Sequence, residues 1–239
     1  MSIKICDVRM VPRHVGIIMD GNRRFAKSLN LSPWKGHEYG EKKVTELLEW
    51  CKELGVKEVT IYAFSVQNLN RPKKEFDYLM KIFLRGADKM LNDSRWSSSG
   101  VRIRILGDTC CFPSDVQEKL RLLVEKTKDN EEYFLNVALG YGGREEILRA
   151  VKSISVKVSE GELSPDAIDE SVFQEHLYMS SSPDLIIRTG GDHRTSNFLP
   201  WQSTYSEWFF VDKTWPEFSK EDFVKCLEDF SVRERRFGK

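Results

Sequence analysis

The chain has 239 residues, and its 37 basic and 37 acidic side chains give a formal net charge of zero. That balance argues against a protein that coats nucleic acid, because such binding is driven by an excess of lysine and arginine. A composition of 40% hydrophobic and 31% charged residues is typical of a globular chain and excludes a disordered or fibrous one. No apolar run approaches the ~18 residues of a membrane span, and none near the N-terminus predicts a secretory signal. The five cysteines, an odd number without a C-x-x-C pair, favour reduced thiols over a disulfide framework or a zinc ribbon.

Short apolar, β-branched segments alternate with longer amphipathic segments along the chain. Nearly continuous apolar runs of this length are typical of strands buried on both faces of a parallel sheet. The predicted strands are Val15–Met19, Glu58–Phe64, Val101–Leu106, Phe134–Leu139, Asp184–Arg188 and Trp208–Val211. The predicted helices are Glu41–Leu54, Lys73–Leu91, Ser114–Lys128, Arg144–Ser159 and Lys220–Phe230. This alternation predicts an α/β fold, a single domain over residues 1–239 with a central, mainly parallel six-stranded sheet flanked by helices.

Charge is distributed unevenly along this predicted domain. Residues 159–187 contain seven acidic side chains and no lysine or arginine, a pattern that by itself indicates a solvated surface. Arginines concentrate at Arg23–Arg24, Arg188–Arg194 and Arg233–Arg236, which are strand ends or lie near the chain terminus. Open α/β sheets bind ligands beyond the carboxyl ends of their strands, so the arginines predict a ligand site at that edge.

The first predicted strand leads directly into Asp20, and Gly21 and Asn22 then permit a sharp turn into a helix. This order places Asp20 at the carboxyl edge of the sheet and points the backbone N–H groups of Gly21–Arg24 outward, where they suit a phosphate. A carboxylate beside a phosphate site also suits Mg²⁺, which prefers one or two carboxylates together with phosphate oxygens. A simple helix cap at Asp20 accounts for this segment equally well.

Polar side chains also follow the second predicted strand. Ser65 and Asn68 lie just past its end, before Arg71 and a proline that favours the start of a helix. Uncharged hydrogen-bonding groups at a strand edge can orient a substrate or relay a proton. A helix-capping loop explains the same residues as well.

The densest polar segment follows the fifth predicted strand. Arg188 and Arg194 flank a Gly-Gly pair there, and Ser196 comes shortly after. Planar guanidinium groups and glycine amides in such a loop can clamp a diphosphate. His193 in the same loop would, taken alone, more often be structural than a ligand.

These segments together resemble the cis-prenyltransferases, the Z-type polyprenyl diphosphate synthases that include undecaprenyl and dehydrodolichyl diphosphate synthases. The resemblance covers the chain from His14 to Lys239. It rests on several motifs in the order and spacing of that family: His14-Val15, Met19-Asp20-Gly21-Asn22-Arg23-Arg24, Gly36-His37, Tyr62-Ala63-Phe64-Ser65 with Asn68 and Arg71-Pro72, Asn136 with Tyr141-Gly142-Gly143-Arg144, Arg188–Gln202, and Arg233-Glu234-Arg235-Arg236-Phe237-Gly238.

The resemblance implies a Mg²⁺-dependent enzyme that condenses isopentenyl diphosphate onto an allylic diphosphate, such as farnesyl diphosphate. The product would be a long-chain Z-polyprenyl diphosphate, the precursor of a glycan carrier lipid. By motif position, the resemblance implies that Asp20 is the metal-linked carboxylate, that Glu207 and His193 lie near the metal, and that Ser65 and Asn68 position substrate and assist proton removal. The substrate-binding residues that it implies are Gly21, Asn22, Arg23, Arg24, His37, Arg71, Arg188, Arg194, Ser196, Arg236 and Gly238.

The resemblance also implies a homodimer in which Arg236-Phe237-Gly238 reaches the site of the neighbouring subunit. We expect a cytoplasmic protein that associates peripherally, through its lipid product, with the endoplasmic reticulum or a bacterial plasma membrane, and no nucleic-acid partner. We also expect the apolar stripe of the second predicted helix to line a product channel, although such a stripe is otherwise core. Its members are Phe76, Leu79, Met80, Phe83, Met90 and Leu91.

Two alternative functions are weaker. A non-catalytic scaffold subunit of a heteromeric cis-prenyltransferase would lack the catalytic aspartate and the strand-end arginine motif, and both are present here. A phosphate-binding α/β hydrolase would carry a G-x-S-x-G elbow or a P-loop, and neither occurs. The chain also has no Asp-Asp pair, unlike the D-D-x-x-D motifs of trans-type prenyl synthases.

Overall fold

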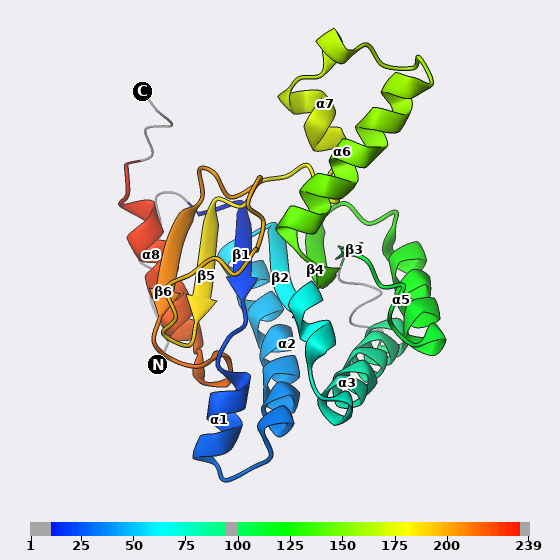
Figure 1. Cartoon of the computed structure of the whole chain (residues 1–239). Coiled ribbons are helices and arrows are strands. Elements are labelled where there is room, and N and C mark those ends of the chain that lie inside the picture. The colour runs from blue at the N-terminus through cyan, green and yellow to red at the C-terminus, as the bar shows by residue number, and fades with distance from the viewer. Residues whose placement is uncertain (1–10, 94–99, 235–239) are drawn as a thin grey trace.

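The computed structural model describes residues 11–93 and 100–234 of the chain. Its six strands form one sheet in the order β3-β4-β2-β1-β5-β6, and every neighbouring pair is parallel (Figure 1). The strands are β1 (His14–Ile18), β2 (Glu58–Ser65), β3 (Val101–Leu106), β4 (Tyr133–Tyr141), β5 (Leu185–Thr189) and β6 (Glu207–Val211). The predicted α/β fold with a central six-stranded sheet is therefore confirmed, with strand ends displaced by one or two residues.

All five predicted helices are present, and two shorter ones join them in the described part of the chain. The helices are α1 (Asn22–Ser28), α2 (Gly36–Leu54), α3 (Lys73–Asn92), α5 (Ser114–Thr127), α6 (Gly143–Ser159), α7 (Glu170–Glu175) and α8 (Lys220–Ser231). The bounds of α1 were not predicted from the sequence, and α7, whose N-terminus is capped by the Asp169 side chain, was not expected. No helix within the described ranges is long and apolar enough to cross a lipid bilayer.

The start of α2 was predicted wrongly, at Glu41 instead of Gly36. Glycine disfavours a helix interior, so the sequence pattern suggested a later start. A Cβ atom at Gly36 would lie 1.9 Å from the carbonyl oxygen of Asn22, and one at Gly40 would lie 3.0 Å from the Trp215 ring. Close packing of this helix against α1 and the segment before α8 thus requires the glycines and overrides their low helix propensity.

The two faces of the sheet are covered by different parts of the chain. Alternate strand residues such as Val15 and Ile187 pack under α2 and α8, and this cluster forms the larger core. The opposite face carries Ile18 and Ile186, covered by Met179 and by the loop between β5 and β6. Figure 1 shows α6 and α7 extending beyond the end of the sheet opposite to α1. Burial of each large apolar side chain contributes about 1.5–3 kcal/mol, so both faces stabilise the sheet.

The sheet has its topological switch point beside β1. The chain leaves β1 for β2 on one side and later crosses to β5 on the other, so the strand order reverses between β1 and β5. In open α/β sheets a crevice forms beyond the carboxyl ends of the strands at such a point. The segments that follow β1 and β5 begin at Met19 and Gly190 and border this crevice.

Candidate active site

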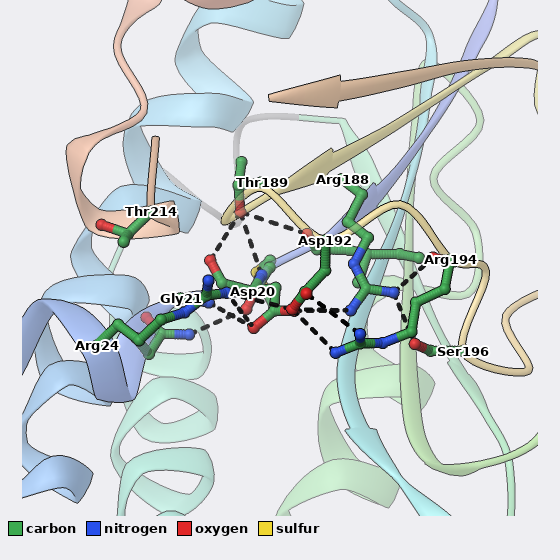
Figure 2. A network of polar contacts seen from close by, with 12 residues as sticks. Asp20, Gly21, Arg24, Arg188, Thr189, Asp192, Arg194, Ser196 and Thr214 are labelled. Atoms are coloured by element: carbon green, nitrogen blue, oxygen red, sulfur yellow. Dashed lines mark hydrogen bonds and ion pairs between the residues drawn. The ribbon is translucent and has the colours of Figure 1, made fainter. Parts of the chain in front are cut away.

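Asp20 and Arg188 meet at the switch point between β1 and β5 (Figure 2). Arg188 Nη2 donates to Asp20 Oδ2 at 2.7 Å, and the Arg188 side chain is only 3% exposed. The Asp20 N–H donates to the hydroxyl of Thr189, which in turn donates to the Asp20 carbonyl. Burial raises the pKa of Asp20, but hydrogen bonds from Arg188 and from the Gly21 N–H lower it by more, so the pKa lies below its usual value. Asp20 is therefore a fixed, ionised carboxylate.

The turn after Asp20 depends on glycine. Gly21 has φ +98°, and a Cβ there would lie within 2.9 Å of Thr214. No side chain caps the N-terminus of α1, which begins at Asn22. The Asn22 amide donates to the carbonyl of Met19, and its own Oδ1 is buried without a hydrogen-bond partner in the described part of the chain.

A second pair of glycines brings the loop after β5 back over Asp20. Gly190 and Gly191 have φ values of +90° and +76°, which lie in the left-handed region that favours glycine. A Cβ at Gly190 would lie 2.6 Å from Arg24 Nη2 and 3.1 Å from the Asp20 carbonyl carbon. The loop can therefore return only if this position has no side chain, and the return places Asp192 beside the arginines of the site.

Three arginines converge on Asp192, as Figure 2 shows. Arg194 donates to both Asp192 oxygens, at 3.1 and 2.9 Å, and Arg24 Nη2 lies 3.4 Å from Asp192 Oδ2. Arg188 Nη2 lies 3.9 Å from the same oxygen, while Arg188 Nη1 donates to the Ser196 hydroxyl at 2.6 Å. We call Arg24, Arg188, Arg194 and Asp192 the switch-point cluster. It joins three of the predicted binding residues, Arg24, Arg188 and Arg194, into one anion-binding geometry.

A second cationic group lies between α1, α2 and the start of α3. Glu75 Oε1 lies 2.5 Å from Arg71 Nη1, 3.6 Å from His37 Nε2 and 3.9 Å from Arg23 Nε. The Glu75 side chain is only 3% exposed. Burial, and then the charge of Arg71, lower the pKa of His37 to about 4, so His37 is neutral near pH 7. We call Arg23, His37, Arg71 and Glu75 the α3 cluster.

Ser65 and Asn68 form the helix cap that the sequence analysis left open. The Ser65 N–H donates to Asn68 Oδ1 at 3.0 Å, and the Ser65 hydroxyl accepts from the backbone N–H of Asn68, which completes a capping box. Both residues also line the cavity described next. The capping geometry holds them at its mouth, so the structural and the binding interpretation are compatible.

A cavity of about 670 Å³ extends from this edge into the molecule. Its mouth is polar, with Asp20, Asn68, Arg71 and Arg188 in the lining. Its body is apolar and lies between the sheet, α2, α3 and α5. The apolar lining includes Val44, Ile61, Leu79, Ile82, Phe83, Met90, Ile103, Leu123, Leu135, Val137 and Leu139. The site can therefore hold a molecule with an anionic head and a long apolar tail.

The predicted channel stripe of α3 is divided between cavity and core. Leu79, Phe83 and Met90 line the cavity. Phe76 and Met80 pack in the cluster around Phe64 and Phe112, and Leu91 packs against the core under α2. A helix of this length presents only part of its apolar side to one cavity, because α5 covers the rest.

The structure does not bring Glu207 to Asp20. Glu207 is the first residue of β6 and pairs with Arg233 at 2.5 Å. It lies at the amino edge of the sheet, about 13 Å along the strand from Val211 at the carboxyl edge. His193 stacks on the ring of Phe210, with 4.8 Å between ring centroids. The predicted metal group of Asp20, Glu207 and His193 is thus not assembled within one chain, and no cluster of three such ligands occurs within residues 11–93 and 100–234.

Two further predicted binding residues, Arg236 and Gly238, lie outside the described residues. The structure also adds three residues to which the sequence analysis gave no role at the site, Glu75, Thr189 and Asp192. The Arg71-to-Glu75 spacing of four, which spans the start of the predicted helix Lys73–Leu91, was the one available signal. Thr189 and Asp192 act through contacts with Asp20 and Arg24, which depend on the pairing of β1 with β5 and cannot be read from spacing.

The fold and the site define a class, an α/β protein whose switch-point site suits a diphosphate carrying a long apolar chain. A family model described as putative undecaprenyl diphosphate synthase matches residues 18–238. The chain therefore belongs to the undecaprenyl diphosphate synthase family of prenyltransferases, as the motifs indicated.

Individual relatives agree with this family. The chain is 48% identical over 231 residues to a tritrans,polycis-undecaprenyl-diphosphate synthase (geranylgeranyl-diphosphate specific) of Methanopyrus kandleri, covering 96% of this chain and 85% of the relative. It is 47% identical over 235 residues to an isoprenyl transferase of Thermus thermophilus, covering 96% and 89%. The crystal structure of lavandulyl diphosphate synthase from Lavandula x intermedia, in complex with dimethylallyl diphosphate, is 35% identical, with a TM-score of 0.89 and coverage of 96% and 99%.

Proposed function

We propose that the protein condenses isopentenyl diphosphate onto an allylic diphosphate and repeats this step to make a long-chain Z-polyprenyl diphosphate, the precursor of a glycan carrier lipid. The observation that carries the proposal is the cavity of about 670 Å³, which joins a cationic mouth to a long apolar body. A diphosphate fits the mouth by charge, and a growing hydrocarbon chain fits the body by the hydrophobic effect.

The arginines of the two clusters support two diphosphate positions, and Arg24 of the switch-point cluster lies on the allylic side. Arg188 Nε is buried and has no acceptor among the described residues, which leaves an unsatisfied donor at the edge of the proposed site. We assign isopentenyl diphosphate to Arg188, Arg194 and Ser196. The allylic diphosphate is assigned to the turn after Asp20, whose residues are Gly21, Asn22, Arg23 and Arg24, with His37 and Arg71 nearby.

The donor set at Asp20 fits Mg²⁺. Asp20 is ionised and lines the cavity, and each carboxylate oxygen keeps a lone pair beyond its hydrogen bonds to Arg188 and Gly21. Because no group of three or more acids, histidines or cysteines that could hold a metal occurs among the described residues, Asp20 would supply a carboxylate and the substrate the remaining oxygens, an arrangement that Mg²⁺ commonly adopts. When bound, the ion would neutralise charge that develops on the departing pyrophosphate.

The chain's own residues would carry out the rest of the reaction. The allylic C–O bond breaks, a C–C bond forms to isopentenyl diphosphate, and a proton leaves the new chain. The arginines stabilise the pyrophosphate leaving group as its charge grows. The apolar cavity wall excludes water from the allylic cation. Ser65 and Asn68 would orient the isopentenyl group and assist removal of its proton.

The allylic primer has two candidates. Farnesyl diphosphate is the primer expected from the sequence, whereas the Methanopyrus kandleri relative is named for specificity toward geranylgeranyl diphosphate. Both have the same diphosphate head and differ in the length of apolar tail that enters the cavity. We propose farnesyl diphosphate and treat geranylgeranyl diphosphate as its competitor in the test.

We further propose a homodimer that associates peripherally with a membrane from the cytoplasmic side. Leu148 and Val151 on α6, and Ile168 just before α7, are exposed apolar side chains that support an association surface in this part of the molecule. The C-terminal Arg236-Phe237-Gly238 would reach the neighbouring subunit's site. Analytical ultracentrifugation measures the oligomeric state, and truncation after Arg235 should lower activity without unfolding the chain.

The test of the proposed reaction uses labelled isopentenyl diphosphate with either primer, in Mg²⁺ or in EDTA, followed by chromatographic sizing of products. We expect long-chain products only with Mg²⁺. Asp20→Ala should lower kcat by about 10²–10³-fold, the scale of losing one transition-state stabiliser. Absence of elongation with both primers would contradict the proposal and favour the scaffold subunit. In that case, mixing the protein with a catalytic chain should restore elongation.

A further inference from the structure

Asp192 occupies the guanidinium groups that the proposed diphosphate site needs. Arg194 Nη1 and Nη2 donate to its two oxygens at 3.1 and 2.9 Å, the same paired geometry that a guanidinium offers to a phosphate. Asp192 Oδ2 also lies 3.4 Å from Arg24 Nη2 and 3.9 Å from Arg188 Nη2. A single carboxylate thus lies at the point where three arginines converge.

The attachment of Asp192 is weak compared with that of Asp20. The Asp192 side chain is 33% exposed, and both Arg24 and Arg194 are more than half exposed. Ion pairs with this exposure contribute little to stability, because water screens them. Asp20, in contrast, is bound to the buried Arg188 and fixed by its own backbone contacts. A multiply charged diphosphate can therefore displace the Asp192 carboxylate while leaving Asp20 in position.

The charge balance of the site depends on Asp192. Arg24, Arg188 and Arg194 carry three positive charges, and Asp20 and Asp192 carry two negative ones. With Asp192 turned away, the arginines face an incoming diphosphate with only Asp20 as their counter-ion. With Asp192 turned in, the Arg194 guanidinium is already paired. Anion binding at this point is consequently an exchange of one anion for another.

We propose that Asp192 is an internal competitor for pyrophosphate. The inference rests on the proposed function, because an enzyme that elongates a chain must release pyrophosphate after every condensation. Pyrophosphate leaves from the allylic diphosphate, which is assigned to the turn that ends in Arg24. By pairing with Arg24 as pyrophosphate leaves, Asp192 lowers the affinity for this product and speeds its release. Its role is to set the strength of the anion site, and it takes no part in bond making.

The test measures binding of inorganic pyrophosphate to the full chain by isothermal titration calorimetry, in EDTA so that no metal contributes. Asp192→Asn keeps the side-chain shape and removes the competing charge. Asp212→Asn is the matched control, because Asp212 directly follows β6 at the same sheet edge but forms no ion pair with any arginine that the structure describes. We expect Asp192→Asn to lower the Kd for pyrophosphate about tenfold, equivalent to 1.4 kcal/mol, and Asp212→Asn to leave it unchanged.

Kinetics provide a second readout. In Asp192→Asn, rapid-quench measurement should show an undiminished first condensation followed by slower steady-state turnover, because release of pyrophosphate is delayed. A purely structural role would slow both phases.

An unchanged or higher Kd for pyrophosphate in Asp192→Asn would overturn the inference, and so would an equal decrease of this Kd in Asp212→Asn. Failure of pyrophosphate to bind any of the three proteins would contradict the diphosphate site itself. Normal binding without elongation would contradict only the proposed reaction.

Discussion

Glu75 and Asp192 each hold three basic side chains at the cavity mouth, but they do so in different surroundings. The Glu75 side chain is 3% exposed and lies 2.5 Å from Arg71, whereas Asp192 is one-third exposed and its contacts range from 2.9 to 3.9 Å. A buried counter-ion cannot leave without exposing unpaired charge, but a partly exposed one can exchange with solvent or ligand. The difference indicates that the α3 cluster is a permanent part of the fold and that the switch-point cluster is adjustable.

The largest expected effect comes from removing the buried acid. Glu75→Ala should lower the free energy of unfolding by about 3 kcal/mol, because it leaves Arg71 and Arg23 without their shared counter-ion. Asp192→Ala should change the free energy of unfolding by less than about 1 kcal/mol. Urea denaturation measures both changes in the free energy of unfolding, and the m-value should be the same in the two variants and the unsubstituted chain. Equal losses of unfolding free energy in the two variants would contradict the distinction between the two clusters.

Loss of a guanidinium from the adjustable cluster should affect binding more than folding. Arg194→Ala should raise KM for isopentenyl diphosphate by about 10–100-fold, since a hydrogen bond to a charged group contributes about 1.5–3 kcal/mol. Its stability should be unchanged, because the Arg194 side chain is 61% exposed. Steady-state kinetics alongside thermal denaturation separate the two effects. An unchanged KM would place Arg194 outside the binding site.

A smaller effect is expected from the pH response of the α3 cluster. Burial and the charge of Arg71 lower the pKa of His37 from 6.5 to about 4. The unfolded chain therefore binds a proton near pH 6.5 that the folded chain binds only near pH 4, and stability is lost as the pH falls through this window. His37→Gln should lose less stability than the unsubstituted chain between pH 6.5 and 4. Urea unfolding across that range measures the two slopes, and identical slopes would contradict the neutral state of His37.

The smallest effect is expected at Ser196. Its hydroxyl accepts a hydrogen bond from Arg188 Nη1 at 2.6 Å, and Arg188 also donates to the Arg194 carbonyl. Ser196→Ala should raise KM for isopentenyl diphosphate by about fivefold, the value of a hydrogen bond worth about 1 kcal/mol. The same assay as for Arg194→Ala provides the comparison. A rise in KM as large as that of Arg194→Ala would mean that Ser196 contacts the substrate more strongly than its position indicates.

Much of the fold could be predicted because buried parallel strands have a recognisable composition. Runs such as Val15–Met19 are continuous in apolar residues, and polar groups that follow them fall at one sheet edge whatever the strand order. Asp20 and Arg188 could be placed at that edge for this reason. Their pairing could not be predicted, because it depends on β1 and β5 being neighbours across 168 residues of sequence.

Glu207 and Glu75 lie in surroundings that their sequence patterns do not reveal, and the physical reasons are similar. Glu207 was assigned to the metal by motif position, but the direction of β6 places it at the far edge of the sheet. Glu75 has the pattern of an exposed helix residue, and only the packing of α3 against α1 and α2 shows that it is buried. Sequence spacing describes one element at a time, whereas these residues obtain their environment from contacts between elements.

The apolar cavity has a consequence for the lifetime of the protein. About 670 Å³ of interior between the sheet, α2 and α3 contains no side chains, so the apolar groups around it lack the neighbours that a filled core provides. A bound polyprenyl chain would supply those neighbours and stabilise the folded state by RT ln(1 + [L]/Kd). Cells short of isoprenoid precursors would then hold the protein in its least stable form, where proteases remove it fastest.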